Sequence, residues 1–135
     1  MKNITIQPLF KYSILLSSIL RNTRDQKENY FMSGRYAFEY SLIELMKNTK
    51  EFTTIYLPNL ICEEVVTIVE NLNLNIEYYD INNKLEIDIK ELEERLTNEL
   101  SVLLIVNYFG FPSQWIELNK IKNRKNCIFI EDNAH

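Results

Sequence analysis

A chain of 135 residues has room for one domain with one modest hydrophobic core. Hydrophobic residues make up 46% of the chain and charged residues 25%, a composition typical of folded globular proteins and not of disordered ones. The formal net charge of -4 is combined with scattered lysines, so the sequence offers no basic stripe and excludes nucleic acid as an expected partner.

Neither a metal site nor a membrane anchor is expected. Cys62 and Cys127 are far apart, and neither has a further cysteine or histidine nearby at metal-ligand spacing. The apolar stretch at 9–20 contains a lysine and three serines, and it is too short and too polar to span a bilayer. It also lacks the cleavage site of a secretory signal. We therefore expect a cytoplasmic protein.

The first 32 residues are expected to form a lead-in helix and loop, followed by one domain at 33–135. Apolar residues within 9–20 have helical spacing, and the polar run 21–29 is typical of a loop. The pattern changes at Ser33, which with Gly34 favours a helix start, and this helix is predicted to end near Asn48. Its predicted apolar face consists of Ala37, Tyr40, Leu42, Leu45 and Met46.

Strands and helices are predicted to alternate through the rest of the chain. Strands are predicted at 53–57, 76–79, 102–106 and 127–130. Helices are predicted between them, over 61–72, from the capping residue Asp88 to Leu96, and over 115–121. Such alternation indicates an α/β fold with a largely parallel sheet covered by helices, in which ligands bind beyond the carboxyl ends of the strands.

The end of the last predicted strand brings unusual residues to such a site. Asp132 and the only histidine of the chain, His135, follow this strand within a few residues. Both are candidate ligand contacts. From spacing alone Asp132 can equally cap a following helix, with His135 as a first-turn surface residue, and the pattern leaves both interpretations open.

Four short motifs occur in order along the chain, SGRYA at 33–37, LPNLIC at 57–62, NYFGFP at 107–112 and IEDNAH at 130–135. Together they resemble the DegT/DnrJ/EryC1/StrS family over residues 33–135. The resemblance implies the type I fold of pyridoxal-phosphate enzymes, here the N-terminal part of its three-layer αβα large domain. Most members of that family look like aminotransferases that move an amino group from an amino acid such as glutamate to a nucleotide-linked keto sugar.

The resemblance also implies residues that bind pyridoxal 5'-phosphate. Gly34 and Arg35 would hold its phosphate, since a helix start offers N–H groups and the positive end of a dipole. Asp132 would pair with the pyridine nitrogen, and His135 would hydrogen-bond the phenolic oxygen. Cys62 falls where many relatives carry an aromatic ring that stacks on the cofactor.

Other interpretations of these residues stay open. Arg35 can be a solvated first-turn residue, and Cys62 can be a small buried hydrophobe at a helix start. Asn107 stands where relatives often carry a histidine, so the sequence leaves its role open.

The family's lysine that binds the cofactor covalently would lie downstream of the IEDNAH motif, and this chain does not contain it. We therefore expect no catalytic residue in the chain and no activity of the chain alone. Three possibilities remain: part of an aminotransferase, a relative resembling the sugar dehydratases that carry histidine in place of the lysine, or a non-catalytic remnant or interaction module. The expected partners are a keto-sugar substrate, an amino-acid donor and, for the full-length enzyme, a second copy in a homodimer.

Overall fold

The computed structural model describes residues 31–49 and 52–133. The predicted lead-in helix and His135 lie outside these residues. Of the predicted lead-in segment 1–32, only residues 31 and 32 are described. One parallel sheet is present in the described part, with the strand order β2-β1-β3-β4. Its strands are β1 (Thr54–Pro58), β2 (Asn75–Tyr79), β3 (Ser101–Val106) and β4 (Cys127–Asp132).

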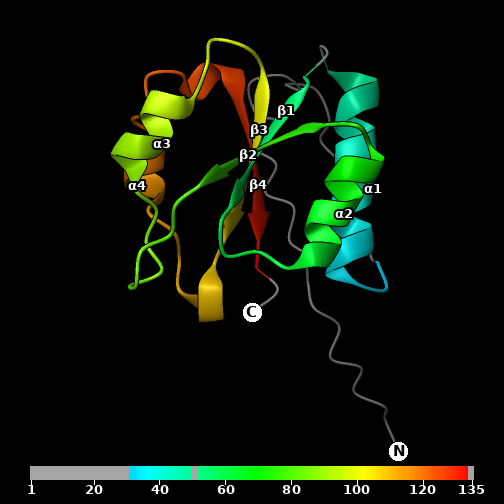
Figure 1. The fold of residues 1–135 in the computed structure, drawn as a ribbon, viewed down its shortest axis with the longest axis horizontal. Helices are drawn as coiled ribbons and strands as arrows, with labels where there is room; N and C mark the ends of the chain where they lie inside the picture. Colours follow the sequence, from blue (N-terminus) through cyan, green and yellow to red (C-terminus); the bar gives the residue numbers. More distant parts are fainter. Residues whose placement is uncertain (1–30, 50–51, 134–135) are drawn as a thin grey trace, which may run out of the picture.

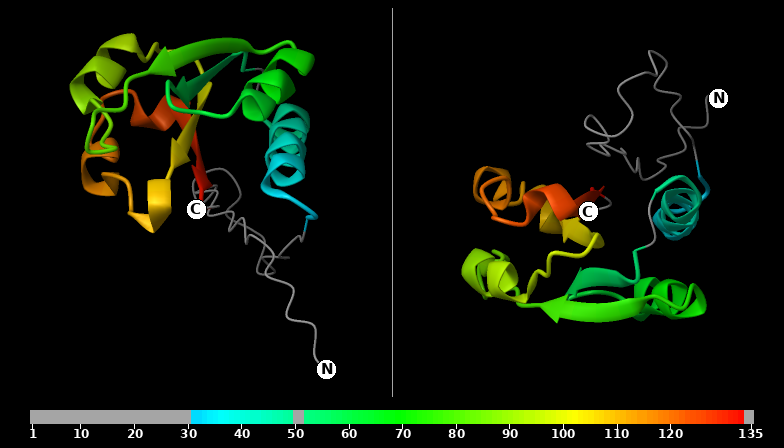
Figure 2. Two further views of the ribbon diagram at one scale, coloured as in Figure 1. Left: turned by 60° about the horizontal axis from the view of Figure 1, so that its bottom comes forward. Right: turned by 90° about the horizontal axis from the view of Figure 1, so that it is seen from above.

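Helices cover both faces of this sheet. The α-helices are α1 (Gly34–Asn48), α2 (Glu63–Asn71), α3 (Ile89–Arg95) and α4 (Trp115–Leu118). Figures 1 and 2 show α1 and α2 on one side of the sheet and α3 and α4 on the other. The predicted three-layer αβα architecture is therefore confirmed for the described residues. None of the helices in this part of the chain is long and apolar enough to cross a membrane.

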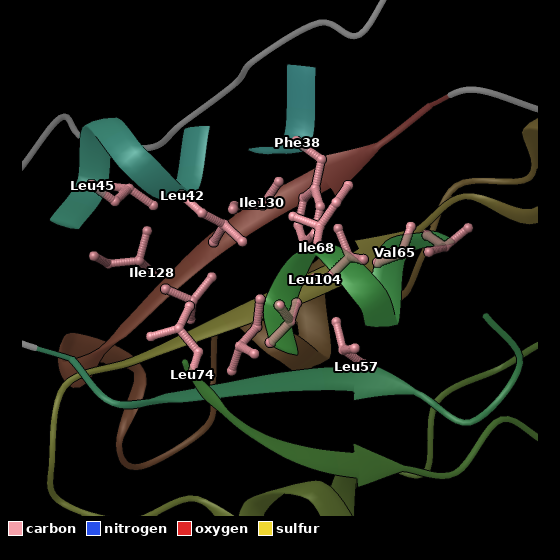
Figure 3. Packing of buried hydrophobic residues seen from close by; sticks show 14 of the residues in the cluster. Phe38, Leu42, Leu45, Leu57, Val65, Ile68, Leu74, Leu104, Ile128 and Ile130 are labelled. Carbon is pink, nitrogen blue, oxygen red and sulfur yellow. The ribbon is translucent and has the colours of Figure 1, made fainter. Parts of the chain in front are cut away.

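The alternation of side chains along the strands builds two hydrophobic cores. All six residues of β3 are buried, as expected for a central strand with helices on both faces. Leu104 faces the core under α1 and α2, where it joins Phe38, Leu42 and Ile130 (Figure 3). The neighbouring Leu103 faces the core under α3 and α4. The strand period of two thus sends successive residues of one strand into different cores.

The predicted helix starts are confirmed by their caps. Ser33 accepts a hydrogen bond from the backbone N–H of Tyr36 at 3.5 Å, at the start of α1. Asp88 accepts one from the N–H of Glu91 at 3.0 Å, at the start of α3. Both side chains satisfy a first-turn N–H group that has no partner within its helix.

The predicted buried face of α1 was partly wrong. Tyr40 and Met46 are 41% and 43% exposed, whereas Phe38 and Ser41 are buried beside Leu42. The apolar residues of this helix allow two stripes rotated slightly against each other, and packing against the sheet selects the one centred on Phe38 and Leu42.

Two element ends also differ from the prediction. Helix α4 ends at Leu118, although Ile121 beyond it is still buried. Strand β4 continues past Ile130 through Asp132, because Glu131 and Asp132 pair in register with the last residues of β3. Asp132 therefore belongs to the sheet.

The strand order places a switch point between the neighbours β1 and β3. From β1 the chain passes through α2 to the outer strand β2, and from β3 it passes through α4 to β4 on the other side. The two connections leave in opposite directions over opposite faces of the sheet (Figure 1). In open α/β sheets such a point, at the carboxyl ends of the strands, is where ligands bind.

Candidate functional site

The carboxyl edge of the sheet collects the predicted site residues that the structure describes. Asp132 is the last residue of β4, and Cys62 is the N-cap residue of α2, just after β1. Gly34 is the first residue of α1, and Figure 1 shows α1 beginning at the end of the molecule to which the arrowhead of β4 points. Three elements thus present these residues at one edge.

Asp132 is a buried carboxylate on the α1 and α2 side of the sheet. It is 9% exposed, and the period of the strand places it on the same face as Ile128 and Ile130, which belong to the core under these helices. Burial of a carboxylate is costly unless polar or charged groups compensate it. A buried acid at the carboxyl end of a strand is accordingly a candidate ligand contact.

Tyr108 lies at the same edge and responds electrostatically to Asp132. Burial raises the pKa of Tyr108 to about 12, and the negative charge of Asp132 contributes in the same direction. The phenol therefore stays protonated in the neutral range and donates its hydrogen bond to the carbonyl oxygen of Leu60. This bond ties the loop after β1 to the end of β3, across the switch point.

Gly34 occupies a position that leaves space beside a helix start. It lies within α1, and Gly110 is the glycine with positive φ among the described residues. Backbone conformation therefore does not require glycine at position 34. What Gly34 provides is the absence of a Cβ atom next to N–H groups that have no partner within the helix, so an anion can approach them closely.

The other predicted cofactor-binding residues are exposed or lie outside the described residues. Arg35 is exposed, with its guanidinium carbon 5.6 Å from the ring centroid of Tyr36. Cys62 is exposed, so the interpretation as a buried hydrophobe at a helix start was wrong on burial. His135 lies outside the described residues. Within 31–49 and 52–133, no cluster of side chains has the composition of a metal site.

Asn107, whose role the sequence leaves open, makes several hydrogen bonds at this edge of the sheet. It is 6% exposed, and its Nδ2 donates to Glu131 Oε1 at 2.7 Å and also to Asn133 Oδ1. Its Oδ1 accepts from the backbone N–H and the hydroxyl of Ser113, both at 2.9 Å. Its own backbone N–H donates to the carbonyl oxygen of Asp132 at 2.9 Å. The ends of β3 and β4 are thus joined through one amide.

Comparison with known proteins gives a family and several relatives. Residues 45–135 match the model of the DegT/DnrJ/EryC1/StrS aminotransferase family. A GDP-4-keto-6-deoxy-D-mannose 3-dehydratase from Yersinia pseudotuberculosis is 26% identical over 125 residues, which are 92% of this chain and 29% of that relative.

Solved structures agree with this match. The Escherichia coli GDP-4-keto-6-deoxy-D-mannose-3-dehydratase with bound hydrated PLP is 30% identical, with a TM-score of 0.65 over 74% of this chain and 27% of that one. A structure from Streptococcus pneumoniae, named as a sugar aminotransferase in its PLP form, has a TM-score of 0.58 at 16% identity, over 75% of this chain and 25% of that one. At that identity the likeness shows the fold alone. The chain spans less than a third of the length of these three proteins.

Proposed function

The chain belongs to the DegT/DnrJ/EryC1/StrS aminotransferase family, and from this premise we propose that it is the N-terminal, cofactor-binding part of a pyridoxal-phosphate enzyme acting on a nucleotide-linked keto sugar. The observation that carries the proposal is the position of Asp132. It is a buried carboxylate at the end of β4, on the face covered by α1, and α1 begins with Gly34 at the same edge.

The described residues fit the two ends of the cofactor. The start of α1 would hold the phosphate, where backbone N–H groups and the missing Cβ of Gly34 favour a bound anion. Arg35 would add a positive charge there by turning from its place over Tyr36. Asp132 would accept a charge-assisted hydrogen bond from the protonated pyridine nitrogen and so keep that nitrogen protonated. When bound, pyridoxal phosphate supplies an electron sink for the carbon that loses its proton.

The residues near Asp132 would support its hydrogen bond to the cofactor. Tyr108 is protonated in the neutral range, so it adds no negative charge beside Asp132. Cys62 is exposed at the start of α2 and would contact one side of the cofactor ring, without the stacking that an aromatic residue provides. His135 would hydrogen-bond the phenolic oxygen, as the family motif implies.

Two reactions are compatible with this site. Amino transfer from an amino acid such as glutamate is the reaction that the resemblance implied. Dehydration at C3 of the sugar is favoured by a specific observation, since the relatives at 26% and 30% identity are both named as 3-dehydratases. The remnant or interaction-module alternative would require that the intact protein bind no cofactor. A cytoplasmic location and a homodimer are part of the same proposal.

The reaction can be decided by product analysis. The protein expressed from its complete gene is incubated with pyridoxal phosphate, glutamate and GDP-4-keto-6-deoxymannose, and the sugar product is identified by its mass. An amino sugar means amino transfer, and a keto sugar that has lost the C3 hydroxyl means dehydration. In the family, the position of the cofactor-binding lysine lies well downstream of the IEDNAH motif. A lysine there should accompany amino transfer, and a histidine there should accompany dehydration. Absence of both products would contradict the proposed substrate class.

The cofactor site is tested by Asp132→Asn in the same full-length protein. We expect the variant to bind pyridoxal phosphate more weakly and to lose turnover by about 100-fold or more, because a neutral amide cannot hold the ring nitrogen protonated. Binding is followed by the visible absorption of the cofactor after dialysis. The matched control is Asp88→Asn, the same change at an exposed helix cap where asparagine caps equally well. Wild-type binding and turnover by Asp132→Asn would refute the assignment.

A further inference from the structure

The hydrogen bonds of Asn107 bracket Asp132 along β4. The amide of Asn107 bonds the side chain of Glu131 before it and that of Asn133 after it, and its backbone N–H bonds the carbonyl oxygen of Asp132 itself. The three consecutive residues Glu131, Asp132 and Asn133 are thus held by one residue that follows β3.

The Glu131 side chain that Asn107 bonds lies on the opposite face of the sheet from the Asp132 carboxylate. Glu131 follows Cys127 and Phe129 on the side of α3 and α4, where it also accepts a hydrogen bond from Trp115 Nε1 at 3.2 Å. Asp132 lies on the side of α1 and α2. Asn107 therefore has no direct contact with the carboxylate side of the strand, and its influence passes through the backbone.

The Asn107 side chain is itself fixed from the other direction. Its Oδ1 accepts from the backbone N–H and the hydroxyl of Ser113, and the single hydroxyl hydrogen is shared with the more distant carbonyl oxygen of Val106 at 3.3 Å. Asn107 is 6% exposed, so an amide group left without a partner by substitution would be costly. An amide that uses both its donor and its acceptor atoms has its orientation determined.

From this arrangement we infer that Asn107 is a positioning residue. From the face of the sheet covered by α3 and α4, it sets the position and orientation in which the Asp132 carboxylate meets the cofactor ring. The inference rests on the proposed function, because it concerns how well the site receives pyridoxal phosphate. Asn107 is not expected to contact a reacting atom. It acts through β4.

The polarity of the bond to Glu131 provides a sharp test. Asn107→Asp keeps the acceptor for Ser113 but loses the donor, and it places a second carboxylate beside Glu131 at a distance where like charges repel. Adding Glu131→Gln restores one donor and one acceptor with the direction of the bond reversed. Glu131 Oε1 accepts from both Asn107 and Trp115, so the Gln side chain has to turn its Nε2 towards position 107 and its oxygen towards Trp115. The Asn133 amide can turn to donate.

The experiment measures the dissociation constant for pyridoxal phosphate by absorption and the amide hydrogen exchange of residues 131–133 without cofactor, both in the full-length protein. Asn107→Asp should raise the dissociation constant at least about tenfold, the scale on which groups that orient a ligating side chain act. It should also speed exchange at 131–133. The double variant Asn107→Asp with Glu131→Gln should return both quantities close to wild type.

The matched control is Asn123→Asp, which removes the donor of another partly buried amide, bonded to the carbonyl oxygen of Leu96 at 3.0 Å, outside the site. It should leave the dissociation constant unchanged. If Asn107→Asp does not fold, the double variant decides alone.

Wild-type affinity in Asn107→Asp, or a folded double variant that stays weak, overturns the inference and leaves the proposed function standing. A wild-type protein that binds no pyridoxal phosphate overturns the proposed function and the inference with it.

Discussion

Single residues at the carboxyl edge differ in how much their sequence context reveals. Asp132 was identified as a candidate because a strand, a carboxylate and a recognisable motif coincide in a short stretch. Asn107 could not be assigned, because its hydrogen-bond partners Glu131 and Asn133 lie 24 and 26 positions further along the chain. Sequence spacing carries no information about which atoms of two such segments will meet. The exposed position of Cys62 could likewise not be read from residue type, since free cysteines are more often buried.

Gly34 permits a test that separates binding from folding. Alanine at this position should weaken the binding of pyridoxal phosphate, because its methyl group fills the space beside the first N–H groups of α1. Stability should not fall, since alanine favours a helix by up to about 1 kcal/mol over glycine. The measurements are the dissociation constant for the cofactor and the thermal midpoint without it. Weaker binding combined with a lower midpoint would instead indicate damage to the fold.

At the scale of elements, hydrophobic patterns predicted the type and order of every strand and α-helix in the described residues. Strand β3 was predictable because a short unbroken apolar run such as 102–106 suits a strand buried on both faces. The end of β4 was not, because Glu131 and Asp132 are polar and their place in the sheet depends on pairing with β3. The stripe on α1 that packs inward was also not predictable, since both candidate stripes share Ala37, Leu42 and Leu45.

Helix α1 supplies the element-scale prediction. Leu42→Ala should reduce the free energy of unfolding by about 2–5 kcal/mol, because Leu42 is fully buried between α1 and the sheet. Met46→Ala, on the exposed side of the same helix, should change it by no more than about 0.5 kcal/mol. Urea denaturation of the two variants compares them directly. Equal losses in both would mean that α1 packs through the originally predicted face.

At the scale of the whole molecule, several buried acids of high pKa make stability depend on alkaline pH. Burial raises the pKa of Cys127 from 9.0 to about 11, and it raises that of Tyr79 well above 10.0. Each of these groups is harder to ionise in the folded chain than in the unfolded chain. Their contribution is therefore complete below the unfolded pKa and is lost as the pH rises towards the folded value.

The resulting prediction concerns the interval from pH 9 to 11. Cys127 ionises there in the unfolded chain while the folded chain keeps its proton, so stability should fall by about 1.4 kcal/mol for each pH unit from this group. The tyrosines add to the slope at the upper end. Free energies of unfolding measured by urea across this interval check the slope. Cys127→Ala should make it shallower, and an unchanged slope would show that the thiol has an ordinary pKa when folded.

The strand order also determines how much chain entropy each strand pairing costs. The outer pairs β1–β2 and β3–β4 join residues 21 and 26 positions apart, from Thr54 to Asn75 and from Ser101 to Cys127. The central pair β1–β3 joins Thr54 to Ser101, 47 positions apart. Closing this larger loop costs more chain entropy, and the contacts between β1 and β3 can offset that cost only after the loop has closed. During synthesis β1 can pair with β2 as soon as both strands have left the ribosome, whereas the switch point between β1 and β3 cannot form until β3 has also emerged.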